Sequence, residues 1–255
     1  MIRFLPLSCL FALVIVPSFG DELADNTVTL DQLSLDLGNL KEWGTKQYTY
    51  SLVQPDGTSD EVLGKLVLST KVEENAIILN DEIAITYKGK RLSGTITLHC
   101  RKDNNLSPTT IESQGEGDDE FGAFVATVDK GKAVVRKNGT ETTIELPEDT
   151  VSTEALMRLV TLIPRKKGTR ISFGHSLETS ELNLKKDFLL ESLGEDTIAR
   201  GDQEIRCTKF QLTSRQIRPM LFWVKDGVLE RMLFDNRKLI DRQIEEGIEL
   251  TPDKS

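Results

Sequence analysis

The segment 174–178, Gly-His-Ser-Leu-Glu, is the part of this sequence that comes nearest to a catalytic motif. A nucleophile elbow places its serine between two glycines, because the tight strand-to-helix turn leaves no room for side chains there. Glu178 stands where the second glycine is needed, and only His99 remains as a separate base. We interpret the segment as a polar strand end. A secreted hydrolase using Ser176 and His175 is therefore the least favoured of three functional hypotheses.

Acidic side chains gather in one expected loop, at Glu116, Asp118, Asp119 and Glu120. Clustered carboxylates can bind calcium, but a helix-loop-helix calcium site needs alternating Asp or Asn side chains, a central glycine and a distal glutamate. This loop does not follow that pattern, so we interpret it as a solvated hairpin loop. The histidines and cysteines show no ligand spacing either. The sequence predicts no metal site and no cofactor.

The first twenty residues have the composition of a cleavable secretory signal peptide. Arg3 supplies a cation, an apolar stretch covers 4–16, and Ser18 and Gly20 are the small residues that a signal peptidase requires. The apolar stretch is shorter than the roughly 20 residues that span a bilayer. We predict cleavage after Gly20 and export of a protein that begins near Asp21, to the periplasm or the cell exterior.

The exported chain is acidic. The sequence has 32 Lys and Arg residues against 41 Asp and Glu residues, a net charge of −9, and loss of Arg3 with the signal peptide would make it −10. Nucleic-acid binding depends on excess cations, so this charge excludes nucleic acid as an expected partner. No second long apolar segment follows Gly20. We expect a soluble protein with, at most, peripheral membrane contact.

Export also bears on Cys100 and Cys207, the cysteines of the expected mature chain. In an oxidising compartment an even pair can form a disulfide, here closing a loop of roughly a hundred residues and stabilising the fold by about 4–5 kcal/mol. Each cysteine also lies within an apolar strand-like pattern, where a free thiol packs well. The sequence leaves a disulfide and two buried thiols as equal alternatives.

Short strands are the elements that would position these residues. From about residue 45, stretches rich in Val, Ile, Thr, Tyr and Phe are separated about every eight to twelve residues by Gly, Asn or Asp, which is typical of consecutive antiparallel strands. Asp226-Gly227 is the clearest two-residue hairpin turn. We predict strands near 46–53, 62–71, 76–87, 92–101, 108–114, 122–128, 132–137, 141–146, 169–175, 185–193, 204–213, 220–225, 228–234 and 237–241.

One segment departs from the strand period of two. Within 147–168 the apolar residues change to the i, i+3, i+4 spacing of an amphipathic helix. Thr150 or Ser152 can cap its start, and Pro164 stops it. A helix over 151–163 cannot leave its apolar face in water. We expect it to cover the sheet or to plug an opening.

These patterns predict a mainly β fold with one large curved antiparallel sheet, a half-barrel or open barrel, and one covering helix. After the signal peptide 1–20, the segment 21–44 is ambiguous, because its leucines fit neither the period of a strand nor that of an α-helix. A single β domain is expected over 45–244. The polar tail 245–255 is expected to fray.

The order of these features resembles the bacterial half-barrel proteins related to periplasmic lipoprotein carriers, especially their uncharacterised secreted relatives. The residues that carry the resemblance are the hairpin 222–231, with its Trp-x-x-Asp-Gly sequence, and the strand start Leu106-Ser107-Pro108. It covers about 45–241. The resemblance implies a curved sheet whose concave face is closed by a helix and can hold acyl chains.

The leading hypothesis is an exported, non-enzymatic protein that binds a lipid or a lipoprotein in the concave face of its sheet. Leu156, Leu159 and Ile163 of the helix and Trp223 of the hairpin are the candidate ligand-binding residues, although Trp223 can instead pack against the helix in an ordinary core. The alternative is an envelope interaction or structural protein without a small-molecule ligand. An empty apolar cavity beneath the helix would favour the first hypothesis, and a filled core the second.

Overall fold

The structure, a computed structural model, describes residues 27–52, 61–87, 90–116, 123–180, 182–234 and 238–243. The predicted signal peptide and C-terminal tail lie outside these ranges, as does most of the acidic loop. No helix in the described ranges is long and apolar enough to cross a membrane.

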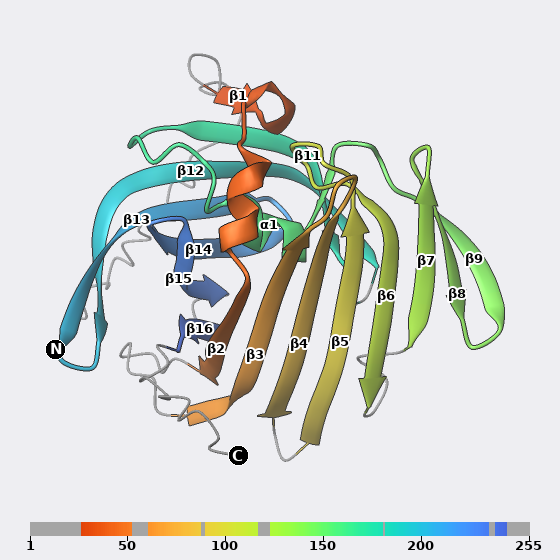
Figure 1. The fold of residues 1–255 in the computed structure, drawn as a ribbon, viewed down its shortest axis with the longest axis horizontal. Coiled ribbons are helices and arrows are strands. Elements are labelled where there is room, and N and C mark those ends of the chain that lie inside the picture. The colour runs from red at the N-terminus through yellow and green to blue at the C-terminus, as the bar shows by residue number, and fades with distance from the viewer. Residues whose placement is uncertain are drawn as a thin grey trace, which may run out of the picture.

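Strands in the first half of the chain pair with their sequence neighbours. β3, β4, β5 and β6 lie side by side across the front of Figure 1, and β7, β8 and β9 continue the sheet at the right. Their bounds are β2 Thr45–Leu52, β3 Glu61–Val72, β4 Ile77–Tyr87, β5 Lys90–Cys100, β6 Pro108–Glu116, β7 Phe124–Asp129, β8 Lys132–Lys137 and β9 Thr140–Glu145.

Strands in the second half form the rest of the same sheet. They are β11 Arg170–Glu178, β12 Asn183–Arg200, β13 Gln203–Ser214, β14 Ile217–Lys225, β15 Val228–Phe234 and β16 Lys238–Arg242. The pairing of β16 with β2 joins the two halves, and Tyr48 donates a hydrogen bond from Oη to the Leu229 carbonyl at 3.0 Å. The short strands β1, Thr27–Thr29, and β10, Thr150–Ser152, pair in parallel with β11 at the far edge.

The result is one 16-stranded sheet that runs from β1 to β9 without closing on itself. This confirms the prediction of one large curved antiparallel sheet. Each predicted strand is present, and most of the observed strand ends lie within a few residues of the predicted ends. Alternation places every second side chain on the concave face. Cross-strand neighbours such as Leu79, Leu98 and Ile111 are fully buried there, in the main apolar cluster.

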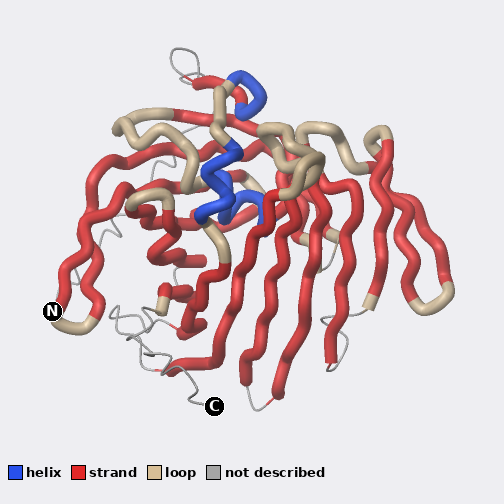
Figure 2. Tube along the Cα trace, in the orientation of Figure 1, coloured by secondary structure: helices blue, strands red, loops and turns tan. Residues whose placement is uncertain are grey.

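The α-helix is shorter than the sequence predicts. Residues 151–152 belong to β10, because Val151 pairs with Ser176 of β11. Ser152 then caps α1, Thr153–Leu159, by accepting a hydrogen bond from the Ala155 N–H at 3.0 Å. The segment after Leu159 forms turns, yet its apolar residues remain buried in the main cluster. In Figure 2, α1 lies in the middle of the view, with strands on both sides.

The ambiguous N-terminal segment contains two 3₁₀-helices, η1, Leu30–Gln32, and η2, Leu37–Glu42. A 3₁₀-helix has three residues per turn, so residues three apart share a face. Leu37, Leu40 and Trp43 have this spacing, and Leu40 and Trp43 are buried in the main cluster. The leucines of this segment match neither a strand nor an α-helix because their spacing is that of a 3₁₀-helix, three residues.

The sheet depends on a close backbone approach at Gly64, where the pairing of β2 with β3 shifts register. A Cβ atom on Gly64 would lie 2.0 Å from the Ala84 carbonyl oxygen and 2.6 Å from Ile85 Cα. We expect Gly64→Ala to lower the free energy of unfolding by about 2 kcal/mol or more, measured by urea denaturation.

Gly139→Asn is the control for that substitution. Gly139 has φ +75° with open space around its Cα, and asparagine tolerates this conformation. A change of about 0.5 kcal/mol or less is expected. Equal effects of the two substitutions would contradict the steric explanation.

Candidate functional site

A cavity of about 350 Å³ lies in the concave face, between the wall formed by β3, β4 and β5 and the wall formed by β12 to β16. Small-molecule sites commonly have volumes of roughly 300–1,000 Å³ and mainly apolar linings. α1 forms part of the boundary. The apolar lining side chains are Leu66, Ile83, Ile96, Leu156, Met157, Phe188, Leu212, Ile217, Met220, Met232, Phe234 and Ile240.

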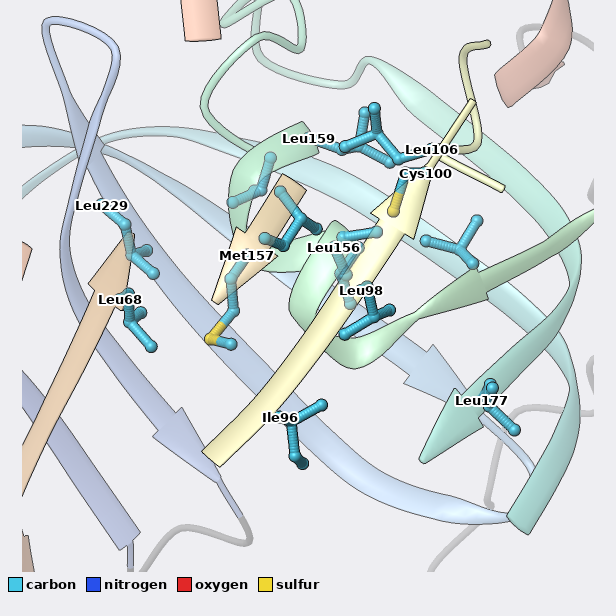
Figure 3. Packing of buried hydrophobic residues seen from close by; sticks show 14 of the residues in the cluster. Leu68, Ile96, Leu98, Cys100, Leu106, Leu156, Met157, Leu159, Leu177 and Leu229 are labelled. Carbon is cyan, nitrogen blue, oxygen red and sulfur yellow. The ribbon is translucent and has the colours of Figure 1, made fainter. Parts of the chain in front are cut away.

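The three helix residues predicted to bind a ligand are all buried, but only one borders the cavity. Leu156 lines it, whereas Leu159 and Ile163 pack in the main cluster away from it. Figure 3 shows Leu156 and Met157 near Leu98 and Ile96 of β5. The first turn of α1 and Met157 therefore form the part of the helix that borders the cavity.

The sequence prediction missed the methionines of the cavity. Met157, Met220 and Met232 line it, and they are three of the four methionines in the whole chain. Methionine is flexible and polarisable, and it is common on surfaces that adapt to varied apolar ligands. Because the chain has so few methionines, these three residues could have been singled out in the sequence as candidates for an adaptable apolar site.

Trp223 does not lie in the concave face. Its neighbours Phe222 and Val224 belong to the main cluster, so alternation along β14 turns Trp223 to the opposite face. There it is 7% exposed, packs in a second apolar cluster, donates from Nε1 to Asp196 Oδ2 at 2.9 Å and lies beneath the Lys209 ammonium. Both sequence interpretations of Trp223, ligand contact and packing against the helix, are wrong about its position.

The two cysteines are free and buried. Cys100 belongs to the main cluster, whereas Cys207 belongs to the second cluster with Trp223. Burial raises the pKa of the Cys207 thiol to about 11 and that of Cys100 further. The structure thus has the second of the two alternatives, two buried protonated thiols.

The segment 174–178 is part of β11, as the strand interpretation predicts. Neighbouring residues of a strand point to opposite faces, so His175 and Ser176 do not meet. Ser176 borders the cavity, whereas His175 Nδ1 lies 2.7 Å from Asp149 Oδ1. A Cβ on Gly174 would lie 1.9 Å from the Asp149 carboxylate, which explains that glycine by packing.

A second, larger hollow of about 1,300 Å³ lies between the N-terminal segment, the β5–β6 turn and the strands β11 to β13. Several of its polar side chains already have structural partners. Asp103 accepts from the Ser107 N–H at 2.8 Å, Asn104 donates to the Leu33 carbonyl at 2.5 Å, and Asp149 is paired with His175. Since these groups are engaged in holding the loops, the apolar cavity is the better candidate site.

Arg158 connects α1 to the sheet beside the cavity. Its side chain is fully buried, and its five N–H groups all donate hydrogen bonds. Two go to the Asp81 carboxylate, at 3.1 and 2.6 Å, and one to Thr70 Oγ1 at 3.2 Å. The others go to the carbonyls of Ser69 and Glu154, at 3.0 and 3.3 Å. The guanidinium therefore has no donor left for a ligand.

Arg158 also holds the N-terminal segment. Its guanidinium carbon lies 4.6 Å from the centroid of the Trp43 ring, at the end of η2. A desolvated cation over an indole is attracted by about 2 kcal/mol. One side chain thus contacts α1, β3, β4 and the residue that follows η2.

Glu154, in the first turn of α1, is a buried carboxyl group at the cavity wall. It is 6% exposed; Oε1 accepts a hydrogen bond from Thr179 Oγ1, and Oε2 has no partner in the described part of the chain. Burial and the nearby Asp81 carboxylate raise the pKa of Glu154 from 4.5 to about 7. Burial also raises the pKa of Asp81, against the opposing effect of Arg158.

Within the described ranges, no three His, Cys, Asp or Glu side chains are grouped so that they could hold a metal ion. The two carboxylates beside Arg158 are therefore not part of such a group. The cavity has an apolar body and one buried ionic wall.

Comparisons with known proteins concern the fold. Neither a scan against protein-family models nor a search of curated proteins finds a match to this sequence. Among solved structures, the chain is similar to the crystal structure of a β-barrel-like protein of a domain of unknown function, DUF1849, from Brucella abortus. The TM-score is 0.51 at 11% identity, over 78% of this chain and 94% of that one. The fold is β-barrel-like.

Breaking the buried ion pair tests its role. We expect Arg158→Met to lower the free energy of unfolding by about 4 kcal/mol, because Asp81 is left buried without its cation. The double variant Arg158→Met/Asp81→Leu should recover most of that loss in urea denaturation. A double variant no more stable than the single one would contradict the charge explanation.

The pKa of Glu154 predicts a pH dependence of stability. The folded state holds this proton more tightly than the unfolded chain, so the free energy of unfolding falls as pH rises from about 4.5 to about 7 and then levels off. The full loss is up to about 3 kcal/mol.

Glu154→Gln should lack this component. Urea denaturation between pH 4.5 and 8 should therefore show the stability of the variant rising relative to the wild type. A difference that stays constant over this range would mean that Glu154 titrates in its ordinary range.

Proposed function

We propose that this protein binds an apolar molecule, such as the acyl chain of a lipid or of a lipid-modified partner, in its concave cavity and does not transform it. The observation that carries the proposal is the cavity itself: about 350 Å³ of space lined mainly by apolar side chains beside α1. A sheet face evolved only for stability would cover these side chains, because apolar area left accessible to water is unfavourable.

The lining suits a flexible acyl chain. Met157, Met220 and Met232 come from three different elements and can each change rotamer to fit a flexible chain. Leu, Ile and Phe side chains supply the rest of the apolar surface. Burial of apolar area would provide most of the binding free energy.

The charges around the cavity bear on where the polar end of such a ligand would lie. Asp81 and Glu154 form the buried wall, and Arg158 has no free donor, so an anionic head group has no partner there. Two cations lie at the cavity border. Arg218 is exposed, and Lys185 forms a salt bridge with Glu178 at 2.7 Å. A neutral ligand, or one whose charged head stays at this border, fits best.

The sequence-based expectations agree with carriage outside the cytoplasm. A signal peptide at 1–20, periplasmic or extracellular location, peripheral membrane contact and a lipoprotein partner would each suit a lipid-binding half-barrel. The resemblance to periplasmic lipoprotein carriers supports the same class of ligand. We therefore include export, peripheral membrane contact and a lipoprotein partner in the proposal.

Filling the cavity tests the function. In Met220→Trp the larger side chain would occupy the space, and binding of the neutral fluorescent probe N-phenyl-1-naphthylamine should weaken at least about tenfold, a loss of about 1.4 kcal/mol. Val125→Trp is the matched control, because Val125 is 45% exposed on β7. It should bind the probe as the wild type does.

Circular dichroism would verify that both variants fold. Equal probe affinity in both variants would show that the probe binds elsewhere. Absence of binding to the wild-type protein would favour the alternative, an envelope interaction protein without a small-molecule ligand.

A further inference from the structure

α1 is both a wall of the cavity and the carrier of a buried acid. Thr153, Glu154, Leu156 and Met157 all border the cavity, and no other α-helix lies in the described ranges. Any displacement of the first turn of α1 would therefore change the shape of the cavity. The interactions between this turn and the sheet therefore determine whether the cavity is closed.

The charges around that turn balance only when one carboxyl carries a proton. Asp81 and Glu154 are two acids beside a single guanidinium, and Arg158 makes both of its side-chain ionic hydrogen bonds with Asp81. Glu154 Oε1 accepts a hydrogen bond from Thr179, and Oε2 has no partner among the residues that the structure describes. A buried carboxylate with an unsatisfied oxygen is strongly disfavoured, whereas the neutral acid is tolerated.

Among the described residues, Arg158 is the only cation that acts on the Glu154 carboxyl, and Arg218 of β14 borders the cavity but is exposed to solvent. On β5 the Cys100 thiol is buried and its pKa is raised, so it stays neutral. Glu178 of β11 and Lys185 of β12 border the cavity but pair with each other at 2.7 Å. Glu82 on β4 is an exposed acid and adds negative charge.

We propose that the proton on Glu154 keeps α1 closed over the cavity, and that loss of this proton to solvent opens the helix and releases the bound molecule. The release part rests on the proposed function. On ionisation Oε2 requires donors, and water supplies them once the first turn moves away from the sheet. Because Leu156 and Met157 move with that turn, the apolar wall of the cavity opens.

Probe affinity as a function of pH tests the release. With N-phenyl-1-naphthylamine, the dissociation constant of the wild type should rise by up to about tenfold per pH unit as the pH increases toward about 7 and then level off, because the closed helix holds one proton more tightly than the open helix does. Glu154→Gln should show no such rise. Glu204→Gln, an equivalent change at an exposed acid of β13 that does not border the cavity, should behave as the wild type does.

Hydrogen exchange without a probe tests the helix itself. After correction for intrinsic exchange rates, protection of the α1 amides should fall at least about tenfold between pH 5 and pH 7 in the wild type and stay constant in Glu154→Gln. The amide of Val160, which bonds to the Leu156 carbonyl at 3.0 Å, is a suitable reporter.

The two experiments separate the two proposals. If no probe binds but the helix loses protection as the pH rises toward 7, the proton-controlled helix stands and the proposed ligand function fails. If the probe binds with the same pH dependence in Glu154→Gln as in the wild type, or if α1 keeps its protection at pH 8, the proton switch is overturned while the ligand function stands.

Discussion

The buried ion pair between Arg158 and Asp81 is the interaction on which the arrangement of helix and sheet depends. A seven-residue helix is too short to be stable alone, so its position must come from tertiary contacts. Arg158 provides them by bonding to β3 and β4 and by lying against Trp43 after η2. Removing a partner from such a pair is costly, because the remaining charge cannot return to water. The pair therefore fixes where α1 lies over the concave face.

This anchoring has a consequence for the cavity. A helix held to the sheet by a specific polar network does not need apolar contacts along its whole face, and space remains beside Leu156 and Met157. The same network brings two acids to one guanidinium, so Glu154 is stable there only with its proton. Polar attachment, apolar space and a carboxyl that titrates near neutrality are thus linked through one helix. In our account, ligand binding and its pH dependence both follow from this arrangement.

The fold could be predicted from the sequence to a large extent, and the site only in part. Alternation and turn residues such as Asp226-Gly227 identify the strands because both signals are local. Local patterns also indicate that Trp223 and its neighbours alternate, but not which set faces the helix, since that depends on sheet curvature. The Arg158–Asp81 pair joins residues 77 positions apart, and an arginine in an amphipathic helix normally faces solvent. Nothing local in the sequence shows that it is buried.

The central claim, that the concave cavity holds an apolar molecule, is tested most directly by native mass spectrometry of the protein purified gently from its own source at a pH below 7. The account predicts a species heavier than the polypeptide by the mass of one apolar small molecule, which dissociates on denaturation and is absent from Met220→Trp prepared in the same way. A bare polypeptide mass for the wild type, or an equal bound mass in both proteins, would contradict it.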